Sequence, residues 1–90
     1  MKPKRRLRDL RNIGPAMEAD FKLLGINQVD QLVDQDAFNL YERLCAKTAE
    51  HHDPCVIDVF MAAIHQAEGG EPLDWWRFTP ERKRLLAEEP

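Results

Sequence analysis

The sequence has few of the residues from which small secreted or membrane proteins are built. Two cysteines in 90 residues cannot form a disulfide framework, and no signal-peptide pattern opens the chain. The longest near-apolar run, residues 55–64, is too short to span a bilayer and contains Asp58. We therefore expect a cytoplasmic, reducing setting and no membrane contact.

The sequence also lacks the residue patterns of the common enzyme and cofactor sites. It holds no Ser-His-Asp order, no paired catalytic carboxylates, no glycine-rich phosphate loop and no HExxH. We expect a non-enzymatic protein that uses no cofactor and no small-molecule ligand.

The net charge of the chain is −3, but the charged residues are unevenly distributed along it. Residues 1–11 hold six basic groups and one acid, residues 12–76 hold three basic groups and twelve acids, and residues 77–90 hold four basic groups and three acids. A basic segment on an acidic body suits contact with a polyanion through one end of the molecule. The alternative is a solvated terminus whose charge favours solubility.

Apolar spacing and turn residues predict an all-α fold, a single domain over residues 1–90 that forms a compact bundle of five to six helices. The predicted helices cover residues 4–11, 15–24, a short segment carrying Val29 to Val33, 36–48, 54–67 and 80–88. Asn27 should cap the short segment, with Asp30 reaching back to the cap.

Two later segments should complete the core. Helix 54–67 is apolar on most sides, which places it at the centre of the bundle. The connector 71–78 holds Trp75, Trp76 and Phe78, which should fold back as a lid, one tryptophan buried and the other partly exposed. Stacking on unpaired bases is the alternative role for these rings.

The stretch from Leu10 to Ile26, LRNIGPAMEADFKLLGI, is the best-defined part of the chain. Its turn leads into an amphipathic helix, with Gly14 expected at positive φ, Pro15 at the first helical position and Gly25 as the C-terminal cap. The stretch resembles the helix-hairpin-helix motif, placed at residues 7–26, whose turn amides bind a nucleic-acid phosphate.

This chain departs from that motif at two places. Asn12 replaces the first hairpin glycine. Pro15, Ala16 and Met17 stand where DNA-binding members often carry a lysine or arginine after the second glycine.

Later blocks extend the resemblance beyond the motif. LYERLC, HDPCVIDVF and GEPLDWWRFT follow the hairpin in the order of the pathogenicity-locus family, and the blocks cover most of residues 7–79. These are small bacterial helix-hairpin-helix proteins, sometimes labelled mitomycin-resistance-like. The resemblance implies DNA binding without an established enzymatic activity.

A phosphate site is expected from hairpin amides and the arginines that precede them. The candidate residues are Arg5, Arg6, Arg8, Arg11, Asn12, Ile13, Gly14, Ala16 and Met17. Amides at a helix N-terminus and the helix dipole attract anions, whereas Glu18 and Asp20 would repel them. We expect weak, sequence-independent DNA binding, and the alternative is a protein-interaction module that uses the acidic body or the tryptophan surface.

Cys55 supports a third hypothesis, a thiol-based redox or detoxification role. A position behind Asp53 at a helix start should favour the thiolate, although an inert, packed thiol is the alternative. His51, His52 and Cys55 have the ligand types of a zinc site, but their spacing matches no familiar zinc module, so we expect no metal. Asp58 should accept a buried hydrogen bond from Trp75, Trp76 or an arginine.

Overall fold

The computed structural model describes residues 5–88, and the class in this range is all-α, without strands. The helical segments, with η marking a 3-10 turn, are η1 (Leu7–Asp9), α1 (Pro15–Leu23), η2 (Val29–Leu32), α2 (Ala37–Thr48), α3 (Cys55–Ala67), η3 (Trp75–Phe78) and α4 (Thr79–Glu88). The four α-helices lie within one residue of their predicted bounds. No helix in the described range is long and apolar enough to cross a membrane.

The predicted count of five to six helices is not confirmed, since the described residues form four α-helices and three 3-10 turns. The segments expected as helices at 4–11 and 29–33 are single 3-10 turns, and Lys4 lies outside the described residues. Like charges weaken a short helix, and Leu10 leaves η1 in an extended conformation. At η2 the Gln31 side chain, in place of Asp30, accepts the amides of Asn27 and Gln28, at 2.7 and 2.9 Å.

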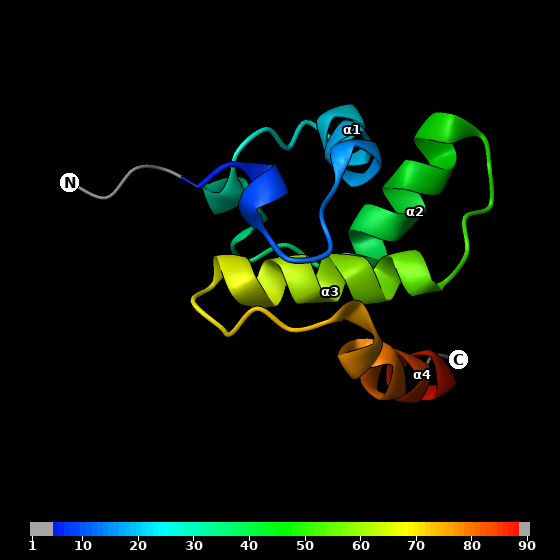
Figure 1. Ribbon diagram of the computed structural model, residues 1–90. Coiled ribbons are helices and arrows are strands. Elements are labelled where there is room, and N and C mark those ends of the chain that lie inside the picture. Colours follow the sequence, from blue (N-terminus) through cyan, green and yellow to red (C-terminus); the bar gives the residue numbers. More distant parts are fainter. Residues whose placement is uncertain (1–4, 89–90) are drawn as a thin grey trace.

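Helix α3 lies across the middle of the molecule. Figure 1 shows α1 and α2 on one side of α3 and the reddish helix α4 on the other. Helix α3 contacts η2, α2, η3 and α4, whereas α1 contacts α2 and η1. The near-continuous apolar surface of α3 is therefore covered from both sides.

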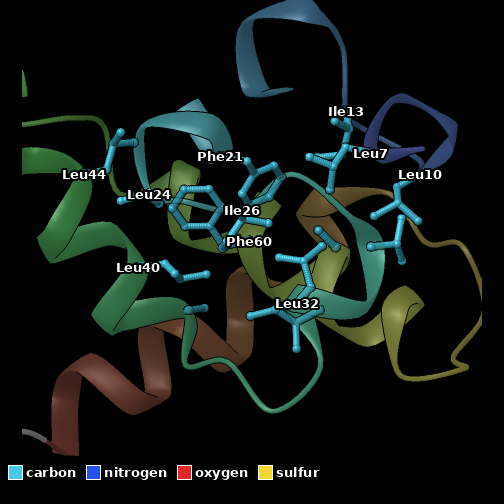
Figure 2. Packing of buried hydrophobic residues seen from close by; sticks show 14 of the residues in the cluster. Leu7, Leu10, Ile13, Phe21, Leu24, Ile26, Leu32, Leu40, Leu44 and Phe60 are labelled. Atoms are coloured by element: carbon cyan, nitrogen blue, oxygen red, sulfur yellow. The ribbon is translucent and has the colours of Figure 1, made fainter. Parts of the chain in front are cut away.

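The main core fills the space between α3 and the N-terminal half of the chain. Figure 2 shows side chains from η1, the turn, α1, η2, α2 and α3 converging there. The rings of Phe21 and Phe60 lie 5.2 Å apart at its centre. The buried cluster comprises Leu7, Leu10, Ile13, Phe21, Leu24, Ile26, Val29, Leu32, Ala37, Leu40, Leu44, Ile57, Phe60, Ala63 and Ile64.

Two helix ends follow the expected local chemistry. At the end of α1, Gly25 takes a φ of +80°, the amide of Ile26 donates to the Phe21 carbonyl, and the Gly25 amide donates to Lys22. This is a Schellman cap. At the start of α2, the Asp36 carboxylate accepts the amides of Phe38 and Asn39, at 2.8 and 3.2 Å.

Helix α4 is attached chiefly through a buried carboxylate on α3. Asp58 is fully buried and accepts hydrogen bonds from the Thr79 hydroxyl at 2.7 Å and from Arg82 Nε at 2.9 Å. Of the three partners expected for Asp58, the arginine is the one observed. No side chain of residues 79–87 is fully buried, so this pair carries much of the docking specificity of α4.

The aromatic side chains of the tryptophan connector are less buried than those of the predicted lid. Trp75 is half-buried, and Trp76 is 55% exposed, with the two rings edge to face at 5.7 Å. Phe78 is half-buried, and its ring meets that of His65 at 5.5 Å.

Candidate nucleic-acid interface

The arginines that precede α1 all have exposed side chains. Arg8 Nε donates to Glu18 Oε1 at 2.9 Å, and Arg11 Nε donates to Asp74 Oδ1 at 2.8 Å. Arg5 reaches the Gln66 carbonyl at 3.4 Å. Arg8 therefore lies beside the first turn of α1, whereas Arg11 and Arg5 lean toward the connector and α3.

In the turn before α1, the residue with a positive φ is not the predicted one. Asn12 takes the left-handed conformation, with a φ of +74°. Gly14 is extended, with φ −108° and ψ −169°, so the expected positive φ at Gly14 is wrong. Asparagine tolerates the left-handed region better than most residues, so Asn12 can replace the first hairpin glycine without loss of the turn.

Two of the predicted contact residues make contacts within the fold. Ile13 is buried in the core, and its amide donates to the Leu10 carbonyl at 3.2 Å. The side chain of Asn12 donates to the Leu73 carbonyl at 2.9 Å, which ties the turn to the connector. These two residues shape the turn, and a phosphate contact by either of them stays a prediction.

The N-terminus of α1 presents amides without a side-chain cap. Gly14 is the N-cap residue, Pro15 occupies the first helical position, and the first backbone bond runs from the Glu18 amide to the Gly14 carbonyl at 3.0 Å. The amides of Ala16 and Met17 therefore precede the first intrahelical donor, as expected at a helix start. Uncapped amides and the positive end of a helix dipole are groups that attract anions.

The acidic side chains of α1 are partly compensated. Glu18 Oε1, which pairs with Arg8, also lies 3.9 Å from Lys22 Nζ. Asp20 is half-buried, and desolvation raises its pKa against the opposing attraction of His52. The two cations near Glu18 offset its charge and so reduce the repulsion that this acid exerts on an approaching phosphate.

Gln66 is an anchor of the basic segment that was not predicted from the sequence. Gln66 is 9% exposed on α3, and its side-chain oxygen accepts the Arg11 amide at 3.0 Å, in addition to the Arg5 contact at its carbonyl. The sequence indicated such a role only by placing a polar residue in helix 54–67, which is apolar on most sides. Gln66 is a positioning residue because it fixes the basic segment against α3.

The thiol of Cys55 has the opposite electrostatics to those expected. Its Sγ donates to Asp53 Oδ1 at 2.7 Å. This hydrogen bond, followed by desolvation and the charge of Asp53, raises the pKa of Cys55, and the same bond lowers the pKa of Asp53. The hydrogen bond of the Cys55 amide at the helix start lowers the pKa, but Asp53 and desolvation outweigh it, so the thiolate is not favoured as the redox hypothesis requires.

The zinc-type ligands are held apart in the structure. The His51 ring packs edge-on against Tyr41, 6.2 Å between centroids, while His52 Nε2 lies 2.9 Å from the Thr48 hydroxyl. Among the residues that the structure describes, no three histidine, cysteine or acidic groups could share a metal ion. His51, His52 and Cys55 therefore do not converge on one point.

Fold and site together define a small all-α protein in which a basic N-terminal segment borders an uncapped helix start. The chain belongs to the pathogenicity-locus family, whose model matches residues 2–84. It is similar to the mitomycin resistance protein McrB of Streptomyces lavendulae, with 46% identity over 83 residues that cover 92% of this chain and 79% of the relative. No solved structure matches the chain significantly.

Proposed function

We propose that the protein is a non-enzymatic module that binds the DNA backbone weakly and without sequence preference, in the manner of a helix-hairpin-helix motif. The observation that carries this proposal is the placement of Arg8 beside the uncapped first turn of α1. The proposed contacts are the side chains of Arg5, Arg6, Arg8 and Arg11 and the amides of Gly14, Ala16 and Met17. Such contacts read phosphate and carry no base information.

The ion pairs of the basic segment are compatible with phosphate binding. The side chains of Arg8 and Arg11 are 54% and 50% exposed. The side chains of their partners Glu18 and Asp74 are 17% and 31% exposed, so both pairs lie at the surface. Surface pairs contribute little, about 0–1 kcal/mol, so a phosphate can compete with the carboxylate for each arginine. The proposed interface is therefore weak, because each arginine exchanges one anionic partner for another.

A fluorescence-anisotropy titration of labelled duplex and single-stranded DNA tests the proposal. The variant Arg5→Ala/Arg6→Ala/Arg8→Ala should weaken binding at least tenfold, since it removes three phosphate contacts. The matched control is Lys47→Ala/Arg77→Ala/Lys83→Ala, which removes the same charge from exposed positions outside the N-terminal segment. Equal losses in both variants would indicate nonspecific attraction, and no binding at low salt would reject the proposal.

The rival function is a protein-interaction module, supported by the 55% exposure of Trp76. A tryptophan exposed beside a polar connector is a typical anchor of an interface. If DNA binding is absent, the substitution Trp76→Ala, which removes no buried core residue, becomes the variant for partner capture.

A role in drug resistance is a second candidate, because the 46% identical relative is named a mitomycin resistance protein. We propose that expression of this chain in a mitomycin-sensitive bacterium raises survival on the drug. The triple arginine variant tests whether that effect depends on DNA binding. Survival equal to that of the empty vector would reject the resistance role.

A further inference from the structure

An open groove of about 490 Å³ lies between the start of α2, the second half of α3 and α4, away from the basic segment. Pockets for small molecules typically measure about 300–1,000 Å³. The apolar surface of the groove comes from Phe38, Met61, Ile64, Phe78 and Leu85. Residues of α2, α3, η3 and α4 thus contribute to one concave surface of drug-binding size.

The charged groups of this groove have one sign. Asp34, Asp36 and Glu68 line it, and its lining residues include no lysine or arginine. Asp36 is engaged in capping α2, while Glu68 Oε2 accepts the Asp34 amide at 2.8 Å. This backbone contact joins Asp34 to Glu68, and the exposed carboxylates of both residues belong to the groove lining, where they can attract a positive group.

The walls of the groove are held in place before any ligand arrives. A Cβ on Gly70 would lie 2.3 Å from the His65 ring, so only glycine allows this ring to pack where it does, against Phe78. On the other wall, the Asp58–Arg82 pair fixes α4, which carries Leu85. Preformed walls reduce the ordering cost of binding.

We infer that this groove is a binding site for small cationic aromatic molecules. The planar apolar part packs between Met61, Phe78 and Leu85, and the positive group lies at the rim beside Asp34 and Glu68. From the sequence no small-molecule ligand is expected, and no local pattern brings these distant residues together. The site is separate from the proposed DNA interface and does not depend on it.

Proflavine, a planar tricyclic cation, is a suitable probe in the absence of nucleic acid. It should bind saturably with a stoichiometry of one, whereas the anionic anilinonaphthalenesulfonate should bind at least tenfold more weakly. Methyl-labelled methionine locates the site, because Met61 lines the groove and Met17 packs against the main core. The Met61 methyl resonance should shift on binding, and that of Met17 should stay in place.

Charge-removing variants test the rim. Asp34→Asn/Glu68→Gln keeps the shape and hydrogen-bonding capacity of both side chains and should weaken proflavine binding about tenfold. Asp30→Asn/Glu50→Gln removes two exposed carboxylates outside the groove and should change affinity less than twofold. Circular dichroism of both variants verifies that the fold is retained.

Three results would overturn the inference. The first is no saturable proflavine binding up to millimolar concentration, and the second is a shift of Met17 without one of Met61. The third is sedimentation showing a dimer that the Asp34→Asn/Glu68→Gln variant dissociates, which would assign the groove to a second copy of the chain.

Discussion

At the scale of single residues, the contact between Cys55 and Asp53 determines the chemistry of the only thiol at a helix start. The thiol donates its hydrogen to a carboxylate that also accepts the Cys55 amide at 2.9 Å. Ionisation of Cys55 would place two negative groups in contact, so the pKa of the thiol is raised and that of Asp53 is lowered. The contact therefore makes Cys55 a poor nucleophile at neutral pH.

Thiol alkylation across pH measures this effect directly. In a Cys45→Ala background, the alkylation rate of Cys55 should reach its midpoint above the ordinary thiol value of about 8.5. The variant Asp53→Asn keeps an acceptor for the Cys55 amide but removes the charge, so its midpoint should fall. A native midpoint at or below the ordinary value would contradict the assignment.

The same contact gives the pH dependence of stability a definite sign. The folded chain holds the thiol proton more tightly than the unfolded chain does. This contribution to the free energy of unfolding is therefore fully present below the unfolded-state pKa and is lost as the pH rises through the folded-state pKa. Urea unfolding should be measured at a pH below the unfolded-state pKa and at one above the folded-state pKa. The free energy of unfolding should fall between these two pH values in the Cys45→Ala background, and should fall by less when Asp53→Asn is added.

At the scale of elements, the N-terminus of α1 has no side-chain cap and is also the proposed phosphate contact. Gly14 has the extended backbone typical of an N-cap, and a Cβ placed there would meet nothing within 4 Å. Serine at this position is an effective cap because its hydroxyl accepts the second or third amide of the helix. Those amides belong to Ala16 and Met17, the same donors that the proposed phosphate contact uses.

The substitution Gly14→Ser should therefore have opposite effects on stability and on binding. The free energy of unfolding should rise by a few tenths of a kcal/mol, while affinity for DNA falls because the hydroxyl occupies the amides. Gly14→Ala is the matched control, since it adds the Cβ without an acceptor. Unchanged DNA affinity in Gly14→Ser would show that the amides bind no phosphate.

Helix α4 depends on one buried charge more than on apolar contact. The Asp58 side chain is fully buried, that of Arg82 is 13% exposed, and Asp58 raises the pKa of Arg82 through their hydrogen bonds. Removing one partner of such a pair leaves the other charge without compensation. The attachment of α4 should therefore be sensitive to Arg82 and insensitive to its exposed neighbours.

Urea denaturation of Arg82→Met tests this dependence. The free energy of unfolding should fall by about 3 kcal/mol, because Asp58 keeps only the Thr79 hydroxyl as a donor from α4. Lys83→Met, at an exposed neighbouring position, should change it by less than about 0.5 kcal/mol. The double variant Asp58→Leu/Arg82→Met should recover part of the loss, and similar values for Arg82→Met and Lys83→Met would refute the argument.

At the scale of the whole molecule, the separation of charge is the property that bears on DNA binding. The net charge of −3 would disfavour a polyanion if it were evenly spread. With the positive groups gathered at residues 1–11, the molecule should approach DNA by that end and keep its acidic body away. Binding of this kind has a modest salt slope, because few counterions are released.

The salt dependence should match the number of arginines at the interface. With two to four phosphate contacts, the logarithm of the association constant should fall with the logarithm of salt concentration with a slope of about −2 to −4. Unrelated duplex sequences should give the same slope and affinity. A slope near zero, or a preference for one sequence, would contradict phosphate binding by the N-terminal segment.

The helices and their ends were predictable because they depend on neighbours in the chain. Apolar spacing located α1 to α4, and Gly25 and Asp36 act as expected. Sequence blocks in the order of the pathogenicity-locus family indicated the family that the comparison then showed. The prediction of a helix at residues 4–11 is wrong within the described range. Like charges weaken a helix there, and the segment forms only a 3-10 turn. The positive φ expected at Gly14 is likewise wrong, since Asn12 adopts it.

Only the tertiary structure decided which distant residues meet. Arg11 pairs with Asp74, Arg5 reaches Gln66, and Asp58 binds Arg82 across separations of 63, 61 and 24 residues. The acidic groove likewise draws on α2, α3 and α4 together. The sequence by itself determined the helices, because hydrogen bonds within a helix and its apolar period are local; packing determined the charge partners and the cavity, because a side chain acquires them only when separate helices share one core.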